Sequence, residues 1–312
     1  MKKILLSAVV IGVMSVSKAQ ETDTIPSNWR LKAIYGINGT QSSFVNWAAG
    51  GRNNISVLGF TSASAKFQKD KVKWDNDLGL ALGGLQYLDA SGDGLQKTDD
   101  RIELASNFGY KVKEDYFLSL NAGFRTQSLD GFSASNDSVR SSTFMAPGYA
   151  NIALGIDYTP NENFSAFLSP LAGKMTFVRD QTLANAGAFG VTKAEYNSLG
   201  EVVTAGKMFR GEFGATFKMR YNKELAKNIE MKSKLELFSN YIENPQNIDV
   251  NAEVLFTFKV NSWFSASLNW NLIYDDDIDL EYKPGQFGPR TQFKSVLGLG
   301  ISYKMQNFEE KK

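Results

Sequence analysis

The stretch that most resembles a ligand-binding motif is an acidic run between residues 89 and 100. Asp89, Ser91 and Asp93 place oxygen atoms at the first, third and fifth positions of a loop, with glycine at the sixth and Asp100 at the twelfth. Calcium loops of the EF-hand type use that spacing. However, Lys97 occupies the ninth position, and the same residue types make ordinary β-turns. We interpret the run as a plain loop and keep it as a weak calcium candidate.

The chain contains no histidine and no cysteine. Hydrolases built on membrane barrels generally use histidine as a general base, because its side chain titrates near neutral pH. Thiol catalysis, disulfides and a lipoprotein anchor are excluded as well. No spacing singles out a Ser–Lys pair or a pair of carboxylates. We therefore expect no enzyme activity and no cofactor. The acidic residues 275–279 could hold a divalent cation or bridge lipid headgroups, but such a run is more often solvated, and we interpret it as a solvated loop.

Charged side chains at alternate positions of several segments are the most informative functional signal. They are Arg101, Glu103, Arg125, Arg210, Glu212, Lys218, Glu230, Lys232, Lys234, Glu236, Asp249 and Glu253. Alternate side chains of a strand share a face, so we expect this set to point into the interior of a closed sheet. Mixed signs on neighbouring strands can pair and fill that interior, or they can line a selective pore. The narrow bore of a barrel of about twelve strands favours the paired interior.

A period of two runs through the chain from residue 29 onward and predicts the strands that must position these charges. The clearest example is 207–221, where Phe209, Phe213, Phe217 and Tyr221 alternate with charged or small residues. At ~3.3 Å per residue its apolar face is long enough for a tilted membrane span. Strands of soluble sandwiches average only about five or six residues. The pattern therefore predicts an all-β fold: a closed antiparallel transmembrane β-barrel.

About twelve strands are predicted, and the connections between them alternate between short and long. The strands centre on residues 30–38, 54–67, 72–87, 99–112, 115–128, 147–158, 163–178, 207–221, 229–241, 247–260, 262–274 and 291–305. The short connections are 68–70, 113–114, 160–162, 222–228 and 261–262, and the long ones are 39–52, 88–98, 129–146, 179–206, 242–246 and 275–290. Tight periplasmic turns and longer outer loops are typical of bacterial outer-membrane barrels. Both termini are then expected in the periplasm.

Aromatic residues, 12% of the chain, gather at the ends of the predicted strands. Trp74, Tyr110 and Tyr158 stand beside short connections, whereas Tyr87 and Tyr241 stand beside long ones. Two belts of amphipathic rings are what the two headgroup levels of a membrane require. Aromatic residues of a soluble core would be scattered along the strands instead.

The first nineteen residues predict export. Lys2 and Lys3 precede an apolar run, and small residues end it at Ala19, which is the pattern of a cleaved signal peptide. A short periplasmic segment (20–28), the barrel (29–305) and a charged tail (306–312) are expected to follow. Basic and acidic residues number 34 and 33, so the net charge of +1 gives no reason to expect a nucleic-acid partner. The predicted location is the outer membrane.

A segment near the start of the barrel region is the most distinctive of the chain. It runs from Gln41 to Asn54 and contains Asn46, Trp47, Gly50 and Gly51 in an Asn-Trp-Ala-Ala-Gly-Gly motif. Together with residues 74–76 and 97–100 it resembles a domain-of-unknown-function family of exported Gram-negative proteins taken to be outer-membrane β-barrels. The resemblance covers essentially the whole mature chain. It implies the barrel fold and the location, and it assigns no activity.

The motif can be interpreted physically as a folded first outer loop, because glycines permit positive φ and the asparagine can form a turn. Such a loop either narrows the barrel mouth or offers a docking surface. Two functions therefore remain open. One is a structural or partner-binding envelope component, with outer-membrane lipid around it and protein partners at its outer loops or periplasmic rim. The alternative is a small-solute, porin-like channel. We favour the first.

Overall fold

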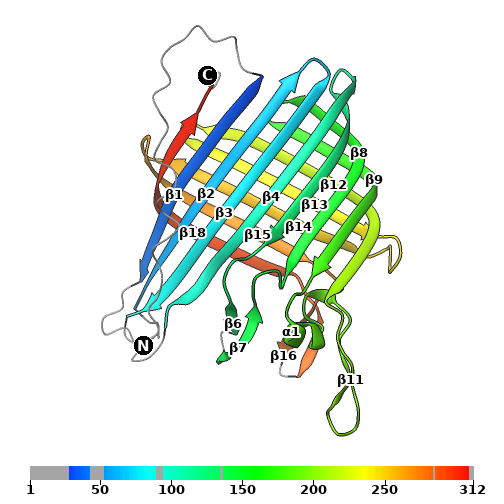
Figure 1. Cartoon of the computed structure of the whole chain (residues 1–312). Coiled ribbons are helices and arrows are strands. Elements are labelled where there is room, and N and C mark those ends of the chain that lie inside the picture. The colour runs from blue at the N-terminus through cyan, green and yellow to red at the C-terminus, as the bar shows by residue number, and fades with distance from the viewer. Residues whose placement is uncertain (1–27, 43–52, 89–93, 134–135, 284, 309–312) are drawn as a thin grey trace.

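The structure, a computed structural model, describes residues 28–42, 53–88, 94–133, 136–283 and 285–308. Twelve strands in these ranges close into one antiparallel barrel (Figure 1). They are β1 (Trp29–Ser42), β2 (Asn54–Lys69), β3 (Val72–Tyr87), β4 (Gln96–Lys113), β5 (Tyr116–Thr126), β8 (Gly148–Asn161), β9 (Phe164–Phe177), β12 (Phe209–Ala226), β13 (Ile229–Asn240), β14 (Ile248–Lys259), β15 (Phe264–Tyr274) and β18 (Gln292–Gln306). Residues 32–39 of β1 pair with 299–306 of β18 and close the ring. The predicted fold class and strand number are confirmed.

The hydrophobic side chains of this barrel lie mainly on its outer surface. Ile37, Leu168 and Leu297 are 55%, 58% and 65% exposed, and their strands alternate between such residues and polar or small ones. The described buried hydrophobic residues form only small clusters, such as the one around Ala153 and Phe238. A soluble protein hides its apolar surface in a core, whereas a membrane barrel presents that surface to lipid. The period-two pattern therefore builds an apolar outer wall and a polar lumen.

Tight turns join the strands at one end of the barrel. Asp70 and Asn228 adopt positive φ values of 52° and 68° in two of these turns, a conformation that Asn and Asp tolerate better than most residues. The described chain enters and leaves the barrel at this same end. There the side chain of Asn307 accepts a hydrogen bond from the backbone N–H of Leu31 at 2.7 Å and donates one to the carbonyl of Trp29 at 3.1 Å.

The aromatic residues form clusters at both ends of the strands. Near the tight turns the rings of Trp29 and Trp74 lie 5.9 Å apart, and those of Tyr116 and Tyr158 stack at 4.8 Å. At the opposite ends Phe177 contacts Phe209 with ring centroids 5.3 Å apart, and Phe213 contacts Tyr241 at 6.0 Å. Rings at both edges of an apolar band are what girdles at two interfaces require.

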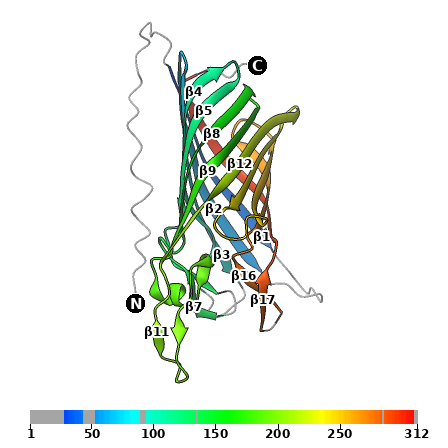
Figure 2. The ribbon, with the colours of Figure 1, turned by 90° about the vertical axis from the view of Figure 1, so that its right-hand side faces the viewer.

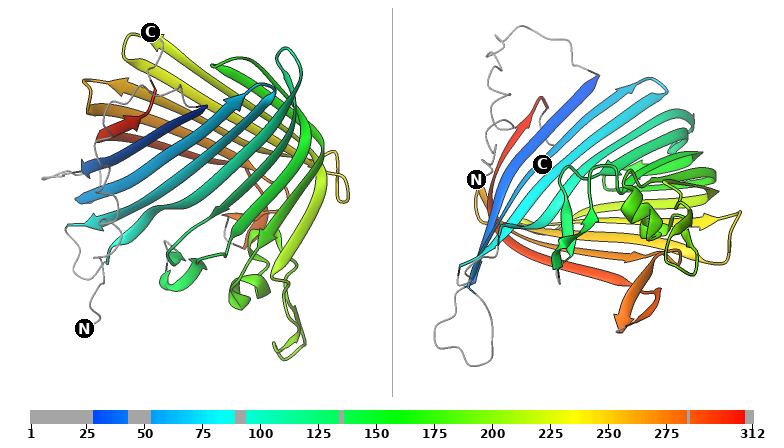
Figure 3. Two further views of the ribbon diagram at one scale, coloured as in Figure 1. Left: turned by 45° about the horizontal axis from the view of Figure 1, so that its top comes forward. Right: turned by 60° about the horizontal axis from the view of Figure 1, so that its bottom comes forward.

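Smaller elements gather at the end opposite the tight turns (Figures 1 and 2). They are the hairpins β6 (Gly131–Ser133) with β7 (Asn136–Ser142), β10 (Glu195–Tyr196) with β11 (Val202–Thr204) and β16 (Asp279–Lys283) with β17 (Gln286–Pro289), and the helices α1 (Gln181–Asn185) and η1 (Ala188–Gly190). A small core containing Val178, Leu183 and Ala184 holds α1 against the end of β9. When this end is turned toward the viewer, the small hairpins and helices lie in front of the barrel strands (Figure 3, right).

Several predicted boundaries are wrong: residues 39–42 and 96–98, expected in loops, belong to β1 and β4. The strand predicted to end at residue 221 continues as β12 to Ala226, because pairing with β13 persists, through a register shift after Glu224, although residues 222–224 are polar on both faces. The connection predicted at 222–228 is therefore a two-residue turn. The longer connection predicted at 242–246 is confirmed, and it lies between Asn240 of β13 and Ile248 of β14. Polarity alone ended the predicted strand too early, since strand pairing continues beyond the apolar band.

The predicted signal peptide, 1–19, lies outside the described residues, as do the loop-motif residues Asn46, Trp47, Gly50 and Gly51. Within the described part of the chain, no helix is long and apolar enough to cross a membrane.

Candidate functional site

All twelve charged residues of the predicted set lie on the lumen face of their strands. The register shows this directly, because Glu103 stands opposite Arg125, Lys218 opposite Glu236, and Lys234 opposite Glu253. Exposed hydrophobic residues occupy the intervening positions. Within the set, Arg101 lies 3.9 Å from Glu103, whereas the guanidinium of Arg125 lies over the ring of Tyr149 at 5.1 Å.

Neighbouring strands carry one group of ion pairs. Lys218 Nζ lies 3.0 Å from Glu236 Oε1, and Lys234 Nζ lies 3.7 Å from Glu253 Oε2. Glu230 pairs with Lys259 of β14, a residue outside the predicted set. These contacts stiffen the wall between adjacent strands. Because these pairs lie along the wall, they are compatible with an open lumen and with a closed one.

A second group of ion pairs joins strands that are not neighbours. Arg220 of β12 lies 3.5 Å from Asp77 of β3, although β9, β8, β5 and β4 separate these strands around the wall. Lys294 of β18 lies 3.0 Å from Asp99 of β4, with β1, β2 and β3 between them. Such contacts must cross the lumen. Side chains from opposite walls therefore meet inside the barrel at two places.

A buried polar cluster lies on the lumen face of β3, β4, β5 and β8, beside the tight turns. Lys73 Nζ donates to Asp157 Oδ2 at 2.7 Å and to Thr159 Oγ1 at 3.0 Å, and it lies 4.0 Å from the centre of the Phe117 ring. Asn107 donates to the same Asp157 oxygen at 2.9 Å. Lys73 and Asp157 are only 8% and 3% exposed. Buried charges persist when they are paired and hydrogen-bonded, as this lysine and aspartate are.

A larger ion cluster occupies the opposite end of the lumen. The ammonium of Lys174 in β9 lies 2.6 Å from Asp249 Oδ2, 3.3 Å from Asp275 Oδ2 and 3.7 Å from Glu212 Oε2. Arg210 contacts Glu212 at 3.5 Å and pairs with Asp277. These two cations connect β9, β12 and β14 to the chain that follows β15. The acidic loop 275–279 is therefore tied to the barrel at Asp275 and Asp277, where the sequence predicted a solvated loop.

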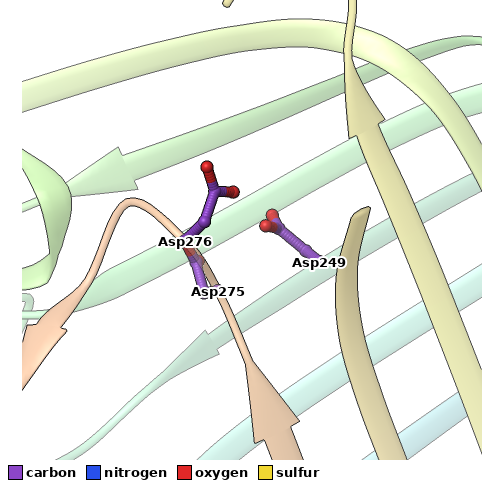
Figure 4. Close-up of side chains that lie close together, drawn as sticks. All are labelled: Asp249, Asp275 and Asp276. Carbon is purple, nitrogen blue, oxygen red and sulfur yellow. The ribbon is translucent and has the colours of Figure 1, made fainter. Parts of the chain in front are cut away.

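Three carboxylates of this cluster approach one another closely (Figure 4). One oxygen from each of Asp249, Asp275 and Asp276 lies within 4.8 Å of the other two, a spacing that could hold a metal ion. Lys174 already provides a positive charge to two of them, and Asn247 donates a hydrogen bond to Asp276. Burial raises the pKa of the nearby Asp277 carboxyl, and the Arg210 guanidinium opposes that rise. The cluster is therefore an ion-paired network that holds the acidic segment against the strands.

Asp100 is the one residue of the weak calcium candidate that the structure describes, and its contacts do not support a calcium site. Asp89, Ser91 and Asp93 lie outside the described residues, and Asp100 lies in β4. The Asp100 carboxylate accepts hydrogen bonds from the backbone N–H groups of Ser128 and Leu129 at 2.9 and 2.8 Å, and from Lys97 Nζ at 3.1 Å. These donors already use the oxygens that a calcium ion would need.

The sequence prediction missed the residues that cross the lumen. They are Lys73, Asp77, Asp99, Asp157, Lys174, Arg220 and Lys294. Each lies at a lumen-facing position of its strand, so the period-two pattern could have included it. The sequence carries no signal for which walls approach each other.

Parts of the chain match protein families. Residues 40–132 match a family of unknown function, DUF3078, and residues 182–284 match a second family of unknown function, DUF481. The expected resemblance to a family of unknown function is thus confirmed, but each of the two matches covers about a third of the chain, where one family was expected over the whole mature chain. None of the proteins with curated descriptions matches this chain.

The chain also matches solved structures of outer-membrane proteins at low sequence identity. A COG4313 outer-membrane channel from Pseudomonas putida F1 has 13% identity and a TM-score of 0.39, covering 93% of this chain and 100% of the other. The translocator domain of the autotransporter NalP from Neisseria meningitidis has 10% identity and a TM-score of 0.35, covering 90% of each chain. The Pseudomonas putida toluene transporter TodX has 10% identity and a TM-score of 0.32, covering 91% and 90%.

Proposed function

We propose that this protein is an outer-membrane barrel with a closed lumen, which serves the envelope as a structural or partner-binding component and not as an enzyme. The exposed apolar residues of its outer wall, among them Ile37, Leu168 and Leu297, support the membrane location. In hydrocarbon every backbone polar group must be paired, and a ring closed between β1 and β18 meets that demand. The absence of histidine and cysteine argues against catalysis.

The ion pairs that cross the lumen carry the proposal. Arg220 with Asp77 and Lys294 with Asp99 join opposite walls, and the buried Lys73–Asp157 pair occupies part of the lumen beside the tight turns. At the other end, Lys174 and Arg210 hold the 275–277 segment against the strands. A solute that passed through would have to break contacts at several levels. A barrel closed in this way acts through its surfaces.

The surface available to a protein partner lies on the long connections, outside the barrel. The β10–β11 hairpin carries exposed apolar residues there, such as Tyr196, Val202 and Val203, which are 54%, 47% and 67% exposed. Rigid elements outside the hydrocarbon are suited to contacts with other envelope components. We propose this end of the barrel, or the periplasmic rim, as the partner-binding region.

Conductance of the purified barrel in planar bilayers tests the closed lumen. We expect no sustained current from the wild-type protein and a measurable current from the variant Arg220→Gln/Asp77→Asn/Lys294→Gln/Asp99→Asn, because that variant lacks both ion pairs between opposite walls. The matched control is Glu230→Gln/Lys259→Gln/Lys234→Gln/Glu253→Gln, which removes two pairs of similar exposure between adjacent strands. The control should stay as silent as the wild type.

A narrow channel for small solutes is the second candidate, and one observation favours it. The side chains of Arg220 and Asp77 keep exposures of 52% and 40%, and Lys234 keeps 57%, so part of the lumen is open to water. In that case the charges would be screened and would set ion selectivity. Steady wild-type conductance whose ion preference shifts in Arg220→Gln/Asp77→Asn would establish the channel and reject the closed barrel.

A further inference from the structure

A groove of about 870 Å³ crosses the outer wall of β18 and β1–β5. The register explains its shape, because small outward-facing side chains of successive strands fall into two adjoining rows. The first row holds Ala33 on β1 and Ala63 on β2, and the second holds Ala65 on β2, Asn76 on β3, Ser106 on β4 and Ala122 on β5. Larger side chains complete both rows, with Leu78, Leu104 and Phe124 in the first and Leu31 in the second. The low band therefore steps from the first row to the second between β1 and β5.

Taller rows flank the groove on both sides. Toward the tight turns, Trp29, Phe67, Trp74 and Phe108 stand opposite one another in succession on β1 to β4. Toward the long connections, Tyr35, Leu80 and Ile102 occupy the next outward-facing row. The groove therefore begins directly beside an aromatic girdle and extends into the apolar band.

One polar cluster faces outward at the edge of the groove. The indole N–H of Trp74 donates to Ser106 Oγ at 2.9 Å, and the Ser106 hydroxyl donates to Asn76 Oδ1 at 2.8 Å. Within the described ranges, the amide nitrogen of Asn76 has no acceptor in the protein. An amide donor facing hydrocarbon without a partner is costly. A molecule bound in the groove should therefore offer a hydrogen-bond acceptor to the Asn76 amide.

The depth of this donor identifies a matching acceptor. Asn76 lies two residues from Trp74 along β3, which is roughly 6.6 Å along a tilted strand. The girdle marks the headgroup level, so the donor lies just inside it. The glycerol ester carbonyls of a phospholipid lie in this zone, carry acceptors only and continue into apolar chains. A second copy of the chain fits less well, since its outer wall would bring mainly apolar side chains.

We propose that this groove binds one glycerophospholipid, whose acyl chain lies over the alanines and whose ester carbonyl accepts a hydrogen bond from Asn76. The proposal rests on the membrane location proposed above and adds a specific lipid site to it. The bound lipid packs into the groove more closely than freely exchanging lipids would. It also gives the Asn76 amide a hydrogen-bond acceptor.

Native mass spectrometry of the detergent-purified barrel, titrated with palmitoyl-oleoyl-phosphatidylethanolamine, tests the site. We expect one lipid to remain bound to the wild type at activation energies that strip the others. Ala63→Leu/Ala65→Leu should lose this lipid, because the new side chains fill the groove. The control Ala252→Leu/Ala266→Leu makes the same change at outward positions of β14 and β15 and should keep it.

The hydrogen bond is tested with the ether analogue of the same lipid, which lacks the ester carbonyls. Wild type should bind the ether lipid roughly two- to tenfold more weakly than the ester lipid, the change expected for one hydrogen bond, whereas Asn76→Leu should bind both equally. Equal lipid retention by the alanine variant and its control would overturn the site. A lipid-free dimer of the wild type would also overturn it, in favour of a second copy. Each outcome counts only for barrels that insert into vesicles; failure to insert would reject the proposed function instead.

Discussion

Lys174 shows how a single residue changes the interpretation of its neighbours. From the sequence, the predicted lumen charges, Glu212 among them, were expected to pair with one another across neighbouring strands. In the structure, β13 ends opposite Gly214, and Glu212 contacts Lys174 of β9 and Arg210 instead. The cluster contains more carboxylates than cations. Removing a cation should therefore destabilise the protein more than removing an acid.

Lys174→Gln should lower the free energy of unfolding by about 3–5 kcal/mol, the usual cost of breaking a buried ion pair from one side. The variant leaves Asp249, Asp275 and Glu212 facing one another without their shared ammonium. Glu212→Gln should cost far less, because Lys174 retains Asp249 and Asp275. Urea unfolding in lipid vesicles measures both. Equal destabilisation by the two variants would contradict the shared-cation arrangement.

The short helix α1 illustrates how the elements beyond the strands are held. Asp180 caps it by accepting a hydrogen bond from the Leu183 N–H at 3.0 Å, and the same carboxylate accepts one from Arg140 of β7 at 3.0 Å. Arg140 also pairs with Asp130 at 3.1 Å. One carboxylate therefore connects the β6–β7 hairpin to the helix.

The helix cap should depend on pH. The Leu183 N–H bond, aided by Arg140, holds the pKa of the Asp180 carboxyl below its usual range. A lowered acid pKa stabilises the fold above the unfolded value, and that stabilisation disappears as the pH falls through the folded value. Hydrogen exchange of the amides of 181–185 should become less protected over that interval, relative to the Asp180→Asn protein, whose cap does not titrate. Parallel pH profiles in the two proteins would contradict the assignment.

For the molecule as a whole, orientation follows from the distribution of connections between the two ends. Hairpins and α1 occupy one end, tight turns occupy the other, and the described chain starts and finishes at the tight-turn end. In bacterial barrels short turns face the periplasm. The β10–β11 hairpin should then face the medium.

The chain lacks cysteine, so single substitutions report their own positions without background. An impermeant maleimide added to intact cells should label Ser198→Cys, in the exposed tip between β10 and β11. It should leave Ser262→Cys, in the turn before β15, unlabelled until the outer membrane is permeabilised. Both serines are exposed, so access alone separates them. The reverse labelling pattern would require the opposite orientation.

Sequence alone determined the strands, their lumen-facing residues and the positions of the aromatic rings. Each depends on a local period, because a side chain's face is fixed by its position within its own strand. The pattern was least reliable where the period carried no apolar signal, as in the extension of β12 to Ala226.

Only the tertiary structure decided which residues meet. The contact between Arg220 and Asp77 depends on how closely opposite walls approach, and the alanine groove depends on the register of six strands with one another. Neither quantity is a property of any one segment. Closure of the ring sets both, because the pairing of every strand fixes the height and separation of residues far apart in the chain.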